Sequence, residues 1–305
     1  MIQPDDLPMD AWPGLPPAEQ HRLTDTWRQI HHAAQAVADL GKRWGEPADD
    51  DSHSAFVLDD DHLCWHAIGS AGKRTAHAWL DFASGTLWLD VEGGPGPRQG
   101  SWLELDGLTI NQTTEWVHRA AERLLGEGPA REGTPPPDLP EHPVSVALGG
   151  AAMELDDEGL DALDAIYDAA AVLLPALVET IASELGASAV GDEATPRIWP
   201  HHFDAASLIV LERDAQGDMT RTVGVGVTPP DSIEGSGYWY VSPWSKGGAI
   251  GFQTPDLPGG RWHARDGADP MALLSISDLA GAGDAEAQGR LLAAFVASAF
   301  NACRA

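Results

Sequence analysis

The segment RIWPHHFDAASLIV, residues 197–210, places two histidines, a tryptophan and an aspartate directly before an apolar run. If residues 197–203 are extended, alternation puts His202 and Asp204 on one face, with Trp199 and His201 on the other. A carboxylate two residues from a histidine can orient the imidazole, or the two side chains can bind a metal. The segment therefore predicts a polar pair, which is either functional or a structural pair that fixes the start of the strand.

More carboxylates and aromatic side chains follow. TPPD (228–231) ends one strand with Asp231, and SGYWYVSPW (236–244) opens the next. Tyr238 and Tyr240 share one face of this strand, while Trp239 and Val241 point the other way and are predicted core residues. Aromatic faces attract cations, and carboxylates accept from hydroxyl or ammonium groups. These features predict a site for a sugar, a base or an organic cation, lined by Trp199, His202, Asp204, Asp231, Tyr238, Tyr240 and Trp244.

Three functions remain open for this site. The first is binding of a small polar or cationic molecule in an aromatic and acidic pocket of the C-terminal half. The second is a hydrolase-type or metal-dependent enzyme, with His202 as general base oriented by Asp204. The third is a non-catalytic scaffold in which the His/Asp pair is structural. The residues indicate no particular cofactor, metal or reaction.

The same motifs also resemble those of a known protein family. IWPHHFD, TPPD and GYWYVSPW resemble an uncharacterised, mainly actinobacterial protein family, a domain of unknown function with W-P-x-H-F-D, S-P-G-D and P-Y-x-Y-V-x-P-W motifs in this order. The chain departs from these motifs at Thr228, Pro230 and Gly237, where the family has serine, glycine and proline. The resemblance implies a site without naming its chemistry. The matching positions are Trp199, Pro200, His202, Phe203, Asp204, Asp231, Tyr238, Tyr240, Val241, Pro243 and Trp244.

Other candidate motifs are weaker. His62, Cys64 and His66 alternate along one predicted strand, so they either seed a zinc or copper site or simply face outward. His31 and His32 lie on a predicted helix, cannot both face one ion, and are expected on the surface. GSAGKRT (69–75) lacks the spacing of a phosphate-binding loop and reads as a hairpin turn.

Charge is the unusual feature of the composition. The formal net charge is −29, with only three lysines, which excludes nucleic acid and anionic lipid as expected partners. A halophilic host explains such an acidic surface, because salt screens its self-repulsion. The chain has no uninterrupted run of the ~20 apolar residues of a membrane span and no signal-like start, so it is expected to be cytoplasmic.

The hydrophobic pattern repeats a helix, an antiparallel meander and a helix in each half. Strands that follow one another without crossover helices indicate an α+β fold of two lobes, possibly a distant internal duplication. The expected lobes are residues 1–126 and 144–305, joined by a proline-rich linker at 127–143. The expected helices cover 17–40, 113–126, 156–186 and 285–301. The expected strands cover 54–58, 62–68, 75–82, 86–91, 101–110, 197–213, 220–228, 237–242, 260–265 and 271–276.

Overall fold

The computed structural model describes residues 1–9, 12–15, 20–48, 52–58, 63–68, 75–92, 100–125, 150–186 and 190–305. They form two compact units. The N-terminal unit contains His21–Asp164 and the short segment Ile198–Phe203. The C-terminal unit contains Asp204–Ala305 together with Met1–Gln20 and Ala165–Arg197. Antiparallel strands flanked by helices make up both units, so the predicted α+β class is confirmed.

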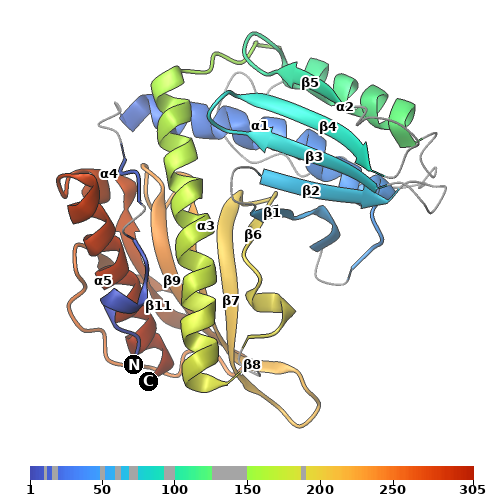
Figure 1. Ribbon diagram of the computed structural model, residues 1–305. Helices are drawn as coiled ribbons and strands as arrows, with labels where there is room; N and C mark the ends of the chain where they lie inside the picture. Colours follow the sequence, from blue (N-terminus) through green and yellow to red (C-terminus); the bar gives the residue numbers. More distant parts are fainter. Residues whose placement is uncertain are drawn as a thin grey trace. The chain divides into compact units, whose positions relative to one another are not determined.

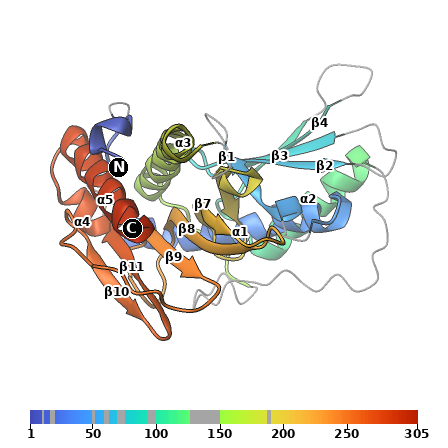
Figure 2. The ribbon, with the colours of Figure 1, turned by 90° about the horizontal axis from the view of Figure 1, so that it is seen from below.

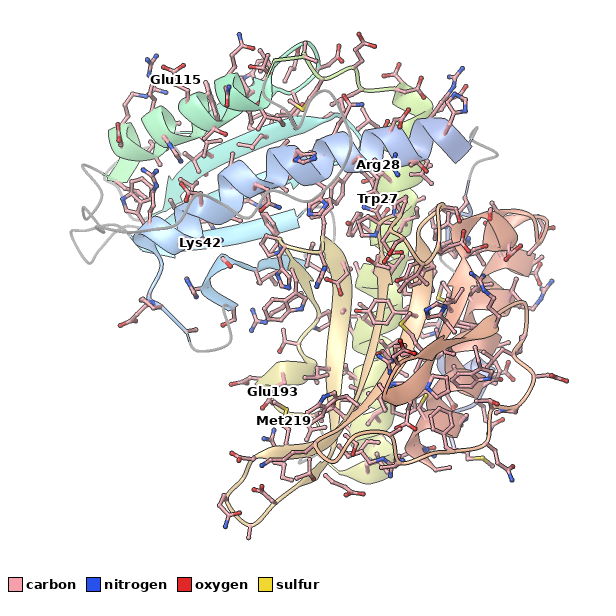
Figure 3. The ribbon with its side chains drawn as sticks, turned by 180° about the vertical axis from the view of Figure 1, so that it is seen from behind. Trp27, Arg28, Lys42, Glu115, Glu193 and Met219 are labelled. Atoms are coloured by element: carbon pink, nitrogen blue, oxygen red, sulfur yellow. The ribbon has the colours of Figure 1, made fainter. Side chains whose placement is uncertain are left out.

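Two helices and a meander make up the N-terminal unit. Its elements are α1 (Gln20–Trp44), β1 (Phe56–Leu58), β2 (Leu63–Ile68), β3 (Thr75–Asp81), β4 (Thr86–Glu92), β5 (Ser101–Glu104) and α2 (Ile110–Leu125), with β6 (Arg197–Trp199) next to β1. Strands β1 to β5 pair antiparallel in sequence order. Figure 1 shows α1 and α2 on one side of strands β2 to β5. Figure 3 shows the same helices from behind, with Trp27 labelled on α1 and Glu115 on α2.

Alternation along β3 and β4 separates two faces of this sheet. Ala78, Leu80 and Leu89 are fully or almost fully buried on the face that α2 covers. Trp79 and Trp88 occupy alternate positions and point to the opposite face, where Trp88 is exposed. The helix-facing side is therefore the core of the N-terminal unit.

The C-terminal unit likewise combines antiparallel sheet strands with helices. Its elements are most of α3 (Asp157–Leu185), then β7 (Asp204–Arg213), β8 (Met219–Thr228), β9 (Tyr238–Ser245), β10 (Arg261–Arg265), β11 (Ala268–Ser275), α4 (Ile276–Ala280) and α5 (Ala285–Arg304). The strand order is β10-β11-β9-β8-β7, and each neighbouring pair is antiparallel. Figure 2 shows α3 and α5 on the same side of this sheet. Trp239 and Val241 of β9 have no exposed surface, so their prediction as core residues is confirmed.

The first residues of the chain belong to the C-terminal unit because they bind α5. The amide of Ile2 donates to Asn301 Oδ1 at 3.1 Å, and Asn301 Nδ2 donates back to the Ile2 carbonyl at 2.7 Å. Gln288 Oε1 accepts from Trp12 Nε1 and from the amide of Leu15. These contacts fix an otherwise irregular segment along the helix.

Most predicted elements lie within a few residues of the observed ones, and the differences have local causes. Helix α2 begins at Ile110, inside the predicted strand 101–110, because Thr109 and Gln112 form an N-terminal cap through their side chains. The predicted strand 197–213 is interrupted by a turn at residues 200–203. The short helix α4 was not predicted, although Ser275 caps it by accepting from the amide of Asp278.

The bounds of the two compact units differ from the bounds of the lobes expected from the sequence. One boundary falls inside α3, between Asp164 and Ala165, and residues 198–203 return to the N-terminal unit. The proline-rich linker predicted at 127–143 lies outside the described residues and stays a prediction.

Helix α3 is long and apolar enough to cross a membrane by length and composition alone. Half of its most apolar window is buried in the protein, and buried core helices meet the same criterion. The helix passes through Pro175 without ending there. Its apolar composition therefore does not decide where the protein resides.

Candidate functional site

The seven predicted ligand-binding residues fall in different parts of the fold. Trp199 ends β6 and His202 lies in the following turn, both in the N-terminal unit. Asp204 begins β7 in the C-terminal unit. That unit also holds Asp231, Tyr238, Tyr240 and Trp244.

The turn at residues 200–203 overturns the predicted extended geometry. The amides of His202 and Phe203 both donate to the Trp199 carbonyl, and Phe203 has a positive φ of 56°. His202 and Asp204 therefore do not share a strand face, and the predicted orientation of His202 by Asp204 lacks its geometric basis. His201 does not point away from His202 either, because the two exposed rings have centroids 4.4 Å apart.

Buried side chains of α1 hold this turn in place. The Pro200 carbonyl accepts from His31 Nε2 at 2.8 Å and from Gln35 Nε2. The fully buried ring of Phe203 stacks on His31 with a centroid distance of 4.9 Å. The prediction that His31 and His32 lie on the surface is wrong, since both are almost completely buried. Much of the W-P-x-H-F-D motif thus has a packing role in the N-terminal unit.

Four of the predicted residues do come together, and we call them the Tyr–Asp cluster: Asp204, Asp231, Tyr238 and Tyr240. The Tyr240 hydroxyl donates to Asp204 Oδ2 at 2.6 Å, and the Tyr238 hydroxyl donates to Asp231 Oδ2 at 2.9 Å. The tyrosine rings meet edge to face, with centroids 6.4 Å apart. The shared face of β9 that the sequence predicts for the two tyrosines explains their contact.

Glycines in β8 make room for this arrangement. Tyr240 pairs with Gly226 across the strands, and Gly226 pairs in turn with Ala206 of β7. A Cβ at Gly226 would lie only 2.8 Å from the Ala206 Cβ, and one at Gly224 would contact the Tyr240 ring at 3.8 Å. The Tyr240 side chain therefore reaches across the glycine positions of β8 to hydrogen-bond Asp204 on β7.

Burial is uneven within the Tyr–Asp cluster. Tyr238 is buried against Met271, Leu273 and Ile233, and Asp204 is only 9% exposed. Tyr240 is half-buried and Asp231 is exposed. The cluster is therefore accessible from the side of Asp231 and Tyr240.

The electrostatics keep both tyrosines protonated. Burial, followed by the charge of the Asp204 carboxylate that accepts its hydrogen bond, raises the pKa of Tyr240 well above its ordinary value of 10.0. Burial and the neighbouring Asp231 charge raise the pKa of Tyr238 as well. Both hydroxyls therefore act as neutral donors to carboxylates throughout the physiological pH range.

The loop between β8 and β9 positions Asp231. Its Oδ1 accepts from the amides of Ile233 and Glu234, at 2.7 and 3.2 Å. Glu234 in turn forms an ion pair with Arg261 of β10 at 2.9 Å. These bonds fix one carboxylate oxygen of Asp231 in the loop, while the other accepts from Tyr238.

Trp244 lies outside the cluster. It shares the face of Tyr240 but is four residues further along β9, about 13 Å away at the usual rise of a strand. Its side chain is half-exposed. The structure therefore brings together four of the seven predicted residues, and separates Trp244 from them along the strand.

A histidine–carboxylate pair does occur in the N-terminal unit, at residues the sequence analysis missed. His118 Nε2 of α2 donates to Asp39 Oδ2 of α1 at 2.7 Å, and Arg43 Nε lies 2.8 Å from the same oxygen. Burial alone would raise the pKa of Asp39, but the His118 hydrogen bond and the Arg43 charge outweigh it and lower that pKa. Asp39 occupies a position on the buried side of α1, and this pattern could have revealed it.

Nothing in the described part of the chain gathers three or more histidine, cysteine or acidic side chains into a metal-binding group. That finding does not test the metal site considered at His62, Cys64 and His66. His62 lies outside the described residues, and only the backbone of Cys64 and His66 is described, in β2.

Comparisons with known proteins find no match to any family model, curated protein or solved structure. The resemblance of the W-P-x-H-F-D, S-P-G-D and P-Y-x-Y-V-x-P-W motifs to an uncharacterised family therefore stays a prediction.

Proposed function

We propose that the protein binds a small polar or cationic molecule at the Tyr–Asp cluster of the C-terminal unit. The observation that carries this proposal is that the hydroxyls of two tyrosines on one face of β9 both donate to carboxylates, at 2.6 and 2.9 Å. This arrangement holds aromatic rings and negative charges together in fixed positions.

The charges favour a cation. Asp204 and Asp231 accept hydrogen bonds from neutral hydroxyls, and a neutral donor leaves the carboxylate charge in place. Within the described residues, no lysine or arginine forms an ion pair with Asp231. The half-buried ring of Tyr240 adds a surface that attracts organic cations.

Binding is better supported than catalysis. A tyrosine whose pKa is raised does not become a base near neutral pH, so neither Tyr238 nor Tyr240 is suited to accept a proton. The proposed general base, His202, lies in an exposed turn without the predicted strand-face relation to Asp204. The enzyme alternative thus loses the geometry on which it depended.

The overall charge supports the same class of ligand. A net charge of −29 repels phosphates and anionic headgroups, so nucleic acid and acidic membrane are not proposed partners. It also raises the local concentration of cations near the surface. A cytoplasmic, salt-adapted setting remains part of this proposal.

Calorimetric titration with choline tests the proposal. The matched control ligand is the neutral isostere of choline, in which carbon replaces the nitrogen. Choline is expected to bind and the isostere to bind much more weakly. Asp231→Asn is expected to weaken choline binding about tenfold, because an ion pair near a protein surface contributes a few kcal/mol before desolvation.

Asp256→Asn provides the control, since it removes the same charge from an exposed position of the same unit. It is expected to leave choline affinity unchanged. Equal binding of choline and the isostere, or equal effects of the two substitutions, would contradict a cation site at the Tyr–Asp cluster.

A further inference from the structure

The N-terminal unit carries an exposed aromatic surface that the proposed function does not use. Trp79, Trp88 and Trp102 are direct cross-strand neighbours on β3, β4 and β5. Trp88 is 44% exposed and Trp102 is 55% exposed. Their rings have centroids 6.1 Å apart. These three residues form what we call the tryptophan face, on the side of the sheet opposite α2.

Exposure of large apolar side chains to water on a sheet face is energetically unfavourable. Large apolar side chains in register on adjacent strands form a continuous apolar patch, and such patches on soluble proteins are most often interaction sites. The other face of the same strands buries Ala78, Leu80 and Leu89, so the core of the unit does not require the tryptophans. The tryptophan row is therefore available for a partner.

Two carboxylates flank the tryptophans on the same face. Asp81 follows Trp79 by two residues on β3, and the exposed Glu104 follows Trp102 by two on β5. Asp90 follows Trp88 by two on β4, but it is only 8% exposed. Strands β3, β4 and β5 contain no lysine or arginine. The face thus combines the best aromatic surface for a cation with negative charges and no basic strand residue.

The shape favours an extended partner over a small molecule. Small ligands bind in concave pockets that bury most of their surface, whereas this row lies on an exposed sheet face. Neighbouring strands are about 4.8 Å apart, so the row from Trp79 to Trp102 spans about 10 Å. An extended peptide covers this span with about three residues.

We infer that the tryptophan face binds a basic peptide segment whose arginine side chains stack on Trp88 and Trp102 and pair with the flanking carboxylates. Arginine fits better than lysine because its planar guanidinium stacks on a ring and bonds a carboxylate with two N–H groups. This inference concerns the N-terminal unit and does not rest on the cation site proposed at the Tyr–Asp cluster.

Fluorescence anisotropy of a dye-labelled peptide of alternating arginine and glycine tests the inference. Matched peptides replace arginine by lysine or by citrulline, which keeps the shape of arginine without its charge. The arginine peptide is expected to bind most tightly and the citrulline peptide not to bind. Trp88→Leu and Trp102→Leu should each weaken arginine-peptide binding about two- to fivefold, and the double variant should lose more.

The tryptophan substitutions remove no charge, so they separate stacking from general attraction to an acidic protein. Trp244→Leu is the matched control, because Trp244 is 50% exposed in the other unit and should leave the affinity unchanged. Trp102→Phe keeps an aromatic ring and should retain more binding than Trp102→Leu. Thermal melting of each variant checks that it is folded.

Several outcomes would overturn the inference. One is an arginine-peptide affinity that does not change in the Trp88→Leu/Trp102→Leu double variant. Another is equal binding of the arginine and citrulline peptides, and a third is an equal loss in Trp244→Leu. Binding of a neutral oligosaccharide that depends on Trp88 and Trp102, without binding of the peptide, would assign the face to a different class of partner.

Discussion

The Tyr–Asp cluster and the tryptophan face are made from the same two kinds of side chain, aromatic rings and carboxylates, but they are organised differently. In the cluster, tyrosine hydroxyls donate to Asp204 and Asp231, and much of the cluster is buried. On the tryptophan face, Trp88 and Trp102 are exposed, and Asp81 and Glu104 flank the row on β3 and β5. The tyrosine hydroxyls let two aromatic side chains donate to carboxylates, whereas Trp88 and Trp102 leave much of their ring surface in solvent.

The two regions are expected to differ in what they contribute to stability. Buried polar groups need partners, so the cluster contributes to stability as well as to binding. The exposed tryptophans bury less of their surface, so they are expected to contribute less to stability than buried side chains do. Substitutions should therefore change stability in one region and binding in the other.

The largest expected contrast is between two tryptophans. Trp239→Ala, at a position with no exposed surface, should lower the free energy of unfolding by about 3–5 kcal/mol, because it leaves a cavity in the core of the C-terminal unit. Trp102→Ala should lower it by less than about 1 kcal/mol, since the side chain is mostly exposed. Urea denaturation of both variants measures the difference, and equal losses would mean that Trp102 is a core residue.

A smaller contrast is expected between two carboxylates. Asp204→Ala removes the acceptor of the Tyr240 hydroxyl and should cost about 1–3 kcal/mol of stability. Glu104→Ala, at an exposed position beside Trp102, should change stability by less than about 0.5 kcal/mol. The same denaturation experiment gives both values, and a stable Asp204→Ala variant would show that the Tyr240 hydroxyl finds another acceptor.

Alkaline pH should affect the cluster selectively. The folded-state pKa values of Tyr238 and Tyr240 are raised, so their stabilisation is fully present below the unfolded-state value of about 10 and is lost as pH rises above it. Each tyrosine should lower the free energy of unfolding by about 1.4 kcal/mol per pH unit in this range. Denaturation at several alkaline pH values should show a shallower loss in Tyr238→Phe/Tyr240→Phe. An unchanged slope in that variant would remove the raised pKa from the account.

The sequence predicted much of the fold because alternation and helical periodicity are local signals. Strands β3, β4, β8 and β9 and helices α1 and α3 begin and end near their predicted bounds. The shared face of Tyr238 and Tyr240, and the buried positions of Trp239 and Val241, follow from the same period of two.

The site was predicted less well from the sequence. The wrong predictions concern a turn and contacts between residues that are far apart in the chain. The φ of 56° at Phe203 is uncommon for a phenylalanine, and nothing in WPHHFD indicates it. His31 and Gln35 hold that turn from more than 160 residues away, which no local pattern can predict. The sequence analysis did not single out the tryptophan face, because its three residues lie on different strands and only the strand register places them side by side.

The most direct measurement of the proposed cation site uses the tyrosines themselves. The chain has three tyrosines, of which Tyr238 and Tyr240 lie in the cluster, and Tyr167 lies on α3. Fluorine NMR of protein labelled with fluorotyrosine, with signals assigned from single Tyr→Phe variants, reports on all three during a choline titration. If choline binds at the Tyr–Asp cluster, the Tyr238 and Tyr240 signals are expected to shift together and saturate while the Tyr167 signal stays unchanged. A titration that moves none of the three signals, or moves all three equally, would contradict a cation site at the Tyr–Asp cluster.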